Sequence, residues 1–175
     1  MFNFFNRPSA PSFIRLYGNP QAQYDAAQKL IRPGDVAHLI NRNVAPLAAL
    51  LNPPIAEQAA KWLRDHFASG ELSYIADPQG FLDYWCSPAL TLKRNGGDCE
   101  DLSMLAISLI LAAGGTAQLA IGTYWNGSSA VGHAWVEGRD ARGGFLIEAT
   151  TGHLYRTHWR PAQYTCTSLI VPGVA

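Results

Sequence analysis

Apolar residues follow helical spacing in the first part of the chain and strand-like alternation in the second, and the change comes near Gly97. Four segments of the first part are typical of short helices: 21–31, 35–40, 46–51 and 55–67. A longer helix is predicted at 98–113, where Asp98 is a suitable N-cap and apolar residues lie on almost every face. We therefore expect this helix to run through the core.

Beyond the Gly114-Gly115 pair the sequence favours strands that are separated by turns. Turn residues stand at Asn126-Gly127 and at 140–144, between runs rich in β-branched and aromatic side chains. The predicted strands are 116–125, 130–138, 144–150, 154–155 and 168–171. Helices followed by an antiparallel sheet predict an α+β fold.

The length of 175 residues suits one domain. No repeat and no flexible linker divides the chain. We expect residues 1–54 to form an N-terminal arm with short helices packed on the core, and residues 55–175 to form the core itself.

Composition excludes several classes of protein. Hydrophobic residues make up 48% of the chain and charged residues 15%, so extensive disorder is not expected. The net charge is zero, which gives no basic excess for nucleic acid. The longest apolar run, 102–113, is too short to span a bilayer. The N-terminus lacks the pattern of a signal peptide, so cytoplasmic localisation is the default expectation.

Cys99 is the strongest candidate for a reactive group. It opens the predicted central helix, and a helix N-terminus favours a thiolate over a thiol. The other cysteines, Cys86 and Cys166, occupy no such position, and three cysteines form no disulfide framework. A buried, inert thiol is the alternative interpretation of Cys99.

Two further polar residues stand in otherwise apolar strands. His133 lies in Gly-His-Ala-Trp-Val-Glu, and Glu148 lies in Ile-Glu-Ala-Thr. If the strands pair about the 140–144 turn, the two side chains become cross-strand or diagonal neighbours, and a buried acid needs such a partner. With Cys99 they supply a nucleophile, a base and an orienting acid. Asp140 and His153 are weaker alternatives for the third position.

Several motifs together carry a family resemblance. Residues 83–88 (Asp-Tyr-Trp-Cys-Ser-Pro), 96–103 (Gly-Gly-Asp-Cys-Glu-Asp-Leu-Ser) and the two strands above resemble the bacterial transglutaminase-like cysteine peptidases. The resemblance implies a papain-like, transglutaminase-like core, in which a central helix opened by the cysteine packs on an antiparallel sheet. It implies Cys99 as nucleophile, His133 as base and Glu148 as third member. The superfamily usually has aspartate where this chain has Glu148.

The resemblance implies a cysteine peptidase that cleaves a protein or peptide amide through a thioester. Acyl transfer to an amine by the same residues is one alternative, and a non-catalytic binding or assembly module is another. The Cys99 backbone N–H is a natural oxyanion donor. Related folds use a side-chain donor from the segment before the cysteine, which makes Trp85 and Tyr84 candidates here.

Three acids surround the candidate nucleophile: Asp98, Glu100 and Asp101. A favourable interaction with the helix N-terminus explains them without a metal. One periplasmic branch of the resembling family binds calcium through acids beside its cysteine, so the same three residues are calcium candidates. No cofactor is otherwise required, and the sequence leaves the oligomeric state open.

Overall fold

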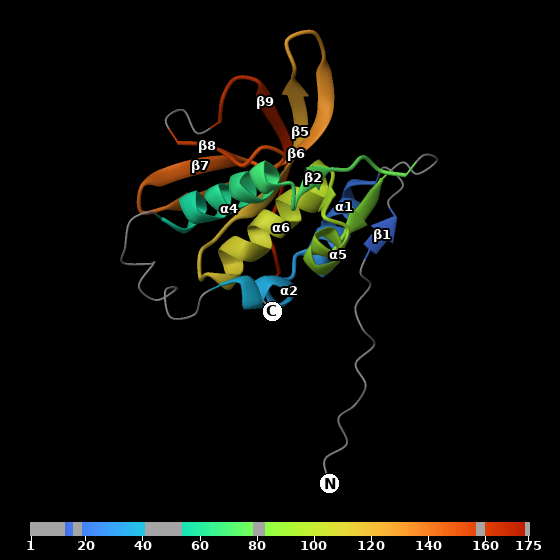
Figure 1. Ribbon diagram of the computed structural model, residues 1–175. Helices are drawn as coiled ribbons and strands as arrows, with labels where there is room; N and C mark the ends of the chain where they lie inside the picture. Colours follow the sequence, from blue (N-terminus) through green and yellow to red (C-terminus); the bar gives the residue numbers. More distant parts are fainter. Residues whose placement is uncertain (1–12, 16–18, 41–53, 79–82, 157–159, 174–175) are drawn as a thin grey trace.

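The computed structural model describes residues 13–15, 19–40, 54–78, 83–156 and 160–173 (Figure 1). It has one central helix, α6 (Cys99–Ala112), which packs against an antiparallel sheet and against shorter helices; α4 (Ile55–Ser69) packs on α6 and on the sheet as well. The predicted α+β class is therefore confirmed. The described helices include none that is long and apolar enough to cross a membrane.

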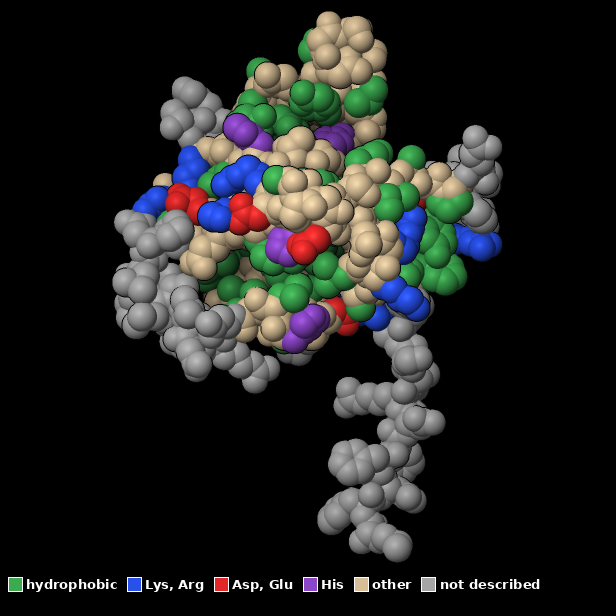
Figure 2. All heavy atoms as spheres, in the orientation of Figure 1, with side chains coloured by type: hydrophobic (Ala, Val, Ile, Leu, Met, Phe, Trp, Pro, Cys, Tyr) green, Lys and Arg blue, Asp and Glu red, His purple; other side chains and the backbone are tan. Residues whose placement is uncertain are grey.

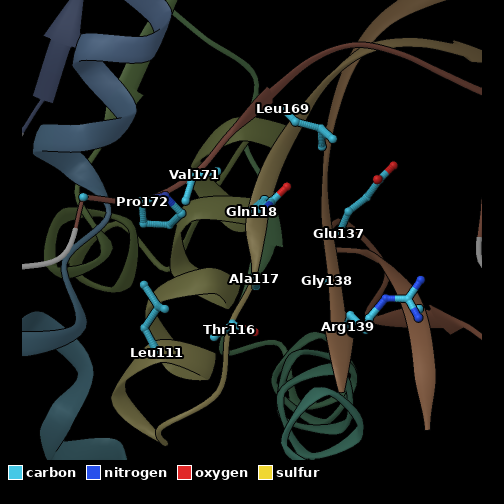
Figure 3. Close-up of a pocket in the computed structure, with 12 residues that line it drawn as sticks. Leu111, Thr116, Ala117, Gln118, Glu137, Gly138, Arg139, Leu169, Val171 and Pro172 are labelled. Atoms are coloured by element: carbon cyan, nitrogen blue, oxygen red, sulfur yellow. The ribbon is translucent and has the colours of Figure 1, made fainter. Parts of the chain in front are cut away.

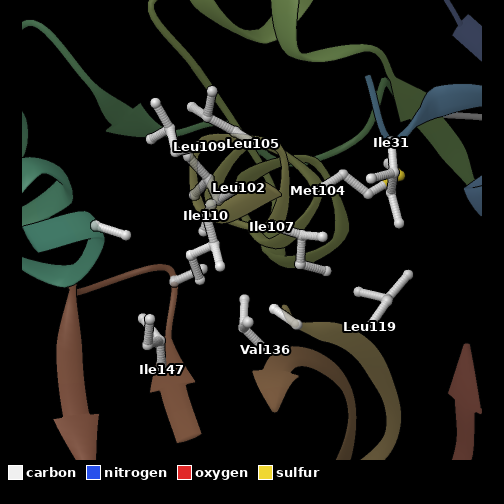
Figure 4. Packing of buried hydrophobic residues seen from close by; sticks show 14 of the residues in the cluster. Ile31, Leu102, Met104, Leu105, Ile107, Leu109, Ile110, Leu119, Val136 and Ile147 are labelled. Carbon is white, nitrogen blue, oxygen red and sulfur yellow. The ribbon is translucent and has the colours of Figure 1, made fainter. Parts of the chain in front are cut away.

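Helix α6 is buried because its apolar side chains point in every direction. Leu102, Leu105 and Ile107 are fully buried. Figure 4 shows them in the core cluster, which also includes side chains of the sheet such as Val136 and Ile147. Complete burial of one such side chain contributes about 1.5–3 kcal/mol, so the packing of α6 fixes its position relative to the sheet.

The other helices agree with the sequence where they are described. They are α1 (Pro20–Leu30), α2 (Pro33–Val36), the 3-10 helix η1 (Ala37–Leu39), α4 (Ile55–Ser69) and α5 (Pro88–Lys93). The predicted helix at 46–51 lies outside the described residues. Helix α5 was not predicted because it has six residues and no apolar period, although Ser87 caps it and Pro88 opens it.

The main sheet has the strand order β8-β7-β6-β5-β9, and all its pairs are antiparallel. Its strands are β5 (Gln118–Trp125), β6 (Ala130–Asp140), β7 (Gly143–Glu148), β8 (His153–Tyr155) and β9 (Tyr164–Ile170). The predicted strands are confirmed in order, but β9 begins four residues earlier than expected. Its first half alternates with threonines, so its apolar content alone did not mark the start.

The two faces of the sheet bury different side chains. Val136 and Ile147 face α6 and belong to the main core. Trp135, Leu146 and Tyr164 form a second, smaller cluster. Because neighbouring residues of a strand point to opposite faces, this cluster lies on the outer face of the sheet.

Two pairs of short strands lie near the N-terminus of α6 and hold the segments that lead into it. Strand β1 (Phe13–Arg15) pairs with β3 (Tyr84–Cys86), and β2 (Ser73–Tyr74) pairs in parallel with β4 (Gly96–Gly97). A Cβ atom on Gly96 would stand 2.0 Å from the carbonyl oxygen of Ser73. Glycine is therefore required for β2 to lie beside the residues that lead into Cys99.

Candidate active site

Cys99 lies at the first position of α6, after the Asp98 N-cap, whose side chain accepts a hydrogen bond from the Asp101 backbone N–H. The cysteine is 8% exposed. Its Sγ donates to Oε2 of Glu100 at 2.9 Å, and it also interacts with the backbone N–H of Ala134. A Cβ atom on Gly97 would stand 2.4 Å from the Asp101 side chain, so glycine is needed immediately before this turn.

The surroundings of Cys99 favour the protonated thiol. Burial raises its pKa, and the negative charges of Glu100 and Asp98 raise it further, while the Ala134 N–H acts in the opposite direction. The helix N-terminus was expected to favour the thiolate. Burial and two carboxylates outweigh that effect here.

His133 and Glu148 form a buried pair on the outer face of the sheet. Nε2 of His133 lies 2.7 Å from Oε2 of Glu148, and their side chains are 14% and 10% exposed. Strands β6 and β7 pair about the 140–143 turn, and the two residues come together beyond the last paired positions, Val136 and Ile147. The sequence prediction that they are neighbours is confirmed.

Glu148 accepts hydrogen bonds on both carboxylate oxygens. Besides His133, the Tyr164 hydroxyl donates to Oε2 at 2.9 Å, and Thr150 donates to Oε1 through its backbone N–H and its hydroxyl. Burial alone would raise the pKa of Glu148, but the bonds from His133 and Thr150 and the His133 charge leave it below its usual value. Glu148 is therefore an ionised, fixed acceptor.

Cys99 contacts the strand that carries His133. Its thiol interacts with the backbone N–H of Ala134, the residue after His133. Nε2 of His133 is engaged by Glu148, so Nδ1 is the ring nitrogen that this contact leaves open. In this structure the thiol hydrogen bond goes to Glu100.

The proposed side-chain oxyanion donors lie in β3. Trp85 is fully buried, and its indole N–H donates to Asp83 at 2.5 Å. The Tyr84 ring stacks on Phe13 with ring centroids 4.8 Å apart. Burial and the charges of Glu100 and Asp77 raise the pKa of Asp83 to about 7, although the Trp85 bond opposes the shift. The Trp85 donor is thus occupied by a neighbouring acid.

Tyr74 is a site residue that the sequence analysis did not identify. It is 56% exposed and pairs with Gly97 in the β2–β4 register, two residues before Cys99. Burial of its hydroxyl end and the charges of Cys99, Asp98 and Glu100 raise its pKa to about 12. No local pattern marks this residue, because only the pairing of β2 with β4 places it beside the residues that lead into Cys99.

The three calcium candidates do not act as one group. Asp101 is 1% exposed, accepts from the Cys86 backbone N–H at 2.6 Å and lies 3.7 Å from Arg94. Among the described residues, no three His, Cys, Asp or Glu side chains form a metal-binding cluster. Asp98 and Glu100 are different, because burial and their mutual repulsion raise the pKa of Asp98. Hard carboxylate oxygens with uncompensated charge fit calcium, whereas Asp101 does not.

The weaker alternatives for the third catalytic position are engaged elsewhere. Asp140 accepts two hydrogen bonds from Arg156, which lower its pKa, and Arg156 also contacts Glu57 of α4. Figure 2 shows basic and acidic side chains side by side in the region of α4 and β8. His153 is exposed and packs against Tyr155. Neither residue bonds to His133 in this arrangement.

A cavity of about 500 Å³ lies at the opposite end of α6 (Figure 3). It is lined by Leu111 in the last turn of α6, by Gln118 and Gly138 of the sheet, and by Val171 and Pro172. Because the helix rises about 1.5 Å per residue, its last turn is about 20 Å from Cys99. The cavity is separate from the candidate active site.

A known protein family matches the part of the chain that contains Cys99, His133 and Glu148. A family model described as the CEP76 peptidase-like domain matches residues 83–171. The centrosomal proteins of 76 kDa from Mus musculus and Homo sapiens are each 36% identical over 115 residues, and the Xenopus tropicalis protein is 38% identical over 115 residues. The match covers 64% of this chain but 16% of the length of each of those relatives.

Solved structures agree with the fold. LapG of Legionella pneumophila in its calcium-bound form has a TM-score of 0.53 at 15% identity, over 89% of this chain and 81% of LapG. A candidate cysteine protease from Cytophaga hutchinsonii has a TM-score of 0.51 at 16% identity, over 69% of this chain and 38% of that protein. The papain-like, transglutaminase-like fold is confirmed, while the matching family model differs from the bacterial family that the motifs resemble.

Proposed function

Since the chain belongs to the CEP76 peptidase-like domain family, we propose that it is a thiol hydrolase that cleaves a protein or peptide amide with Cys99, His133 and Glu148. The observation that carries this proposal is the buried contact of 2.7 Å between Nε2 of His133 and Oε2 of Glu148. It fixes the imidazole on the strand whose next backbone N–H meets the Cys99 thiol. A histidine held in this way has one ring nitrogen free for proton transfer.

The reaction begins when Cys99 loses its proton to Nδ1 of His133 and its sulfur attacks the carbonyl carbon of the amide. His133 returns that proton to the leaving nitrogen as the C–N bond breaks, and a thioester remains on Cys99. Water, deprotonated by His133, then cleaves the thioester and regenerates the thiol. An amine in place of water gives acyl transfer, the alternative outcome of the same steps.

The groups beside Cys99 have different roles in this proposal: some donate hydrogen bonds to the oxyanion, and Glu100 accepts the hydrogen bond of the thiol before the reaction. The Cys99 backbone N–H belongs to the first turn of α6, where N–H groups have no partner within the helix, and it donates to the oxyanion. Glu100 has to release the thiol before Cys99 reacts, because its carboxylate accepts the thiol hydrogen bond. Trp85 donates to the oxyanion only if its indole leaves Asp83.

The test is modification of Cys99 by iodoacetamide between about pH 5 and about pH 10, with the labelled cysteine located by mass spectrometry. We expect Cys99 to react faster than Cys86 at neutral pH, because Cys99 is partly accessible to the reagent and, under this proposal, has His133 as its base, whereas Cys86 is fully buried. His133→Ala should remove most of the Cys99 rate, and Glu148→Gln should reduce it. Equal Cys99 rates in the native chain and in His133→Ala would exclude the proposed base.

A non-catalytic binding or assembly module is the second candidate. The protonated, Glu100-bound thiol favours it, and so do the relatives, which are named as centrosomal proteins. This candidate predicts that Cys99→Ala leaves the chain's biological role intact. The hydrolase predicts that the same substitution removes it.

Calcium is assigned to Asp98 and Glu100 rather than to all three candidate acids. Among the described residues no Lys or Arg is found beside Asp98 or Glu100, whereas Asp101 accepts from the Cys86 backbone N–H and lies beside Arg94. Bound calcium would supply a positive charge beside Cys99. In the same position calcium would compete with the Cys99 thiol for the Glu100 carboxylate, which accepts the hydrogen bond of that thiol.

A further inference from the structure

We propose that Tyr164 is a positioning residue of the active site, whose hydroxyl holds the Glu148 carboxylate where it orients His133. The inference rests on the proposed function of Cys99, His133 and Glu148. It adds to that set a residue of β9, the strand at the edge of the sheet farthest from Glu148 on β7.

Tyr164 reaches Glu148 by lying across the outer face of the sheet. Strands β5 and β6 separate β9 from β7, yet the Tyr164 hydroxyl donates to Oε2 of Glu148 at 2.9 Å. The ring is 5% exposed and packs against Tyr124 and Trp135, with centroids 5.0 and 5.2 Å away. The hydroxyl therefore meets the carboxylate at a fixed angle, because the ring that carries it is held by its neighbours.

The oxygen that Tyr164 contacts is also the oxygen that contacts His133. Nε2 of His133 lies 2.7 Å from the same Oε2, while Thr150 occupies Oε1 through two hydrogen bonds. The carboxylate is thus fixed from three sides. An aspartate at this position is shorter by one methylene and would have to give up at least one of these contacts, so the partners explain why glutamate fits here.

The titratable groups around Glu148 come from three strands. They are His133 on β6, Tyr164 on β9, and His153 and Tyr155 on β8; His153 lies opposite Glu148 in the β7–β8 register, and Tyr155 hydrogen-bonds to Tyr164. Burial and the Glu148 charge raise the pKa of Tyr164, so its hydroxyl remains a donor wherever the site is active. If the ring served only to fill space, phenylalanine would be sufficient.

The experiment compares Tyr164→Phe with Tyr124→Phe in the full chain. The control removes a hydroxyl from a ring that packs against both His133 and Tyr164. The Glu148 carboxyl is titrated by carbon NMR, and the ring nitrogens of His133 report its tautomer. We expect Tyr164→Phe to lower the ratio of ionised to protonated Glu148 about tenfold at a given acid pH, because the carboxylate loses a donor in a buried site. The Nε2–H signal of His133 should also shift at neutral pH, because the carboxylate that it contacts is no longer held in place, while Tyr124→Phe changes neither signal.

A second comparison uses Glu148→Asp. The shorter carboxylate cannot keep all its partners, so adding Tyr164→Phe to Glu148→Asp should change the His133 signals no further. A Tyr164→Phe variant that lowers the melting temperature but leaves the Glu148 titration and the His133 signals unchanged would show a role in packing alone and overturn the inference. These signals do not depend on turnover, so they decide the role of Tyr164 even if Cys99 labelling excludes the hydrolase.

Discussion

At the scale of single residues, the pKa of the Cys99 thiol depends more on burial and on neighbouring carboxylates than on its position at the start of α6. The N-terminus of α6 favours a thiolate, but burial and the Glu100 and Asp98 carboxylates raise the Cys99 pKa. Glu100 acts twice, since its charge repels a thiolate and its Oε2 accepts a hydrogen bond from the thiol, with Sγ 2.9 Å away. Glu100 therefore keeps Cys99 protonated until something moves or neutralises it.

Removing the Glu100 charge should activate Cys99. In Glu100→Gln the like charge is gone, so the pKa of Cys99 falls and its thiolate forms at lower pH. We expect about tenfold faster reaction with iodoacetamide near neutral pH, measured by mass spectrometry. Glu71→Gln is the matched control, because Glu71 is exposed and contacts His66 away from the site. Equal rates in Glu100→Gln and the native chain would contradict this account of Cys99.

At the scale of elements, the N-terminus of α6 collects negative charge that the described structure does not balance. Asp98 caps the helix, Glu100 follows in its first turn, and the pKa values of Asp98 and Asp83 are raised by burial and by neighbouring acids. Asp101 is the exception, because Arg94 and the Cys86 N–H stabilise it. The end of the helix is thus a place where a cation is expected to be stabilising.

Calcium should stabilise the chain through this end of α6. We expect millimolar calcium to raise the melting temperature, and EGTA to reverse the rise, because a divalent cation offsets the repulsion between Asp98 and Glu100. Glu100→Gln should abolish the calcium response. Magnesium is the control cation, since it keeps its waters more firmly. A melting temperature that does not respond to calcium would remove the assignment of calcium to Asp98 and Glu100.

At the scale of the whole molecule, Arg160 links the chain beyond β8 to the outer face of the sheet. Arg160 makes two hydrogen bonds to Glu137, at 2.8 and 2.6 Å, and the Trp135 indole N–H donates to the same carboxylate at 2.8 Å. Glu137 is 3% exposed. This contact lies on the face that also carries His133 and Tyr164, so it helps to hold the strands that form the site.

Arg160→Met should leave the buried Glu137 charge short of a partner. We expect a loss of about 2 kcal/mol in the free energy of unfolding, measured by urea denaturation. Adding Glu137→Gln to the same variant should recover most of that loss, because the uncompensated charge is then removed. Unchanged urea midpoints in Arg160→Met would mean that the ion pair contributes little to holding the outer face.

The sequence by itself determined most of the local elements that the structure describes, and it placed Cys99 at the start of the central helix. Apolar spacing gave α4 and α6, turn residues separated the strands, and the position of Cys99 after Asp98 marked the start of the core helix. Even the pairing of His133 with Glu148 followed from sequence, because a hairpin about one short turn fixes which residues face each other.

Only the tertiary structure decided which groups surround these residues. Tyr164 reaches Glu148 across two intervening strands, and the parallel pairing of β2 and β4 places Tyr74 opposite Gly97, two residues before Cys99. The direction of the Cys99 pKa was also decided there, because burial depends on the whole core and the helix end is only one contribution. Contacts between residues far apart in the chain depend on how elements pack, and no local spacing encodes that packing.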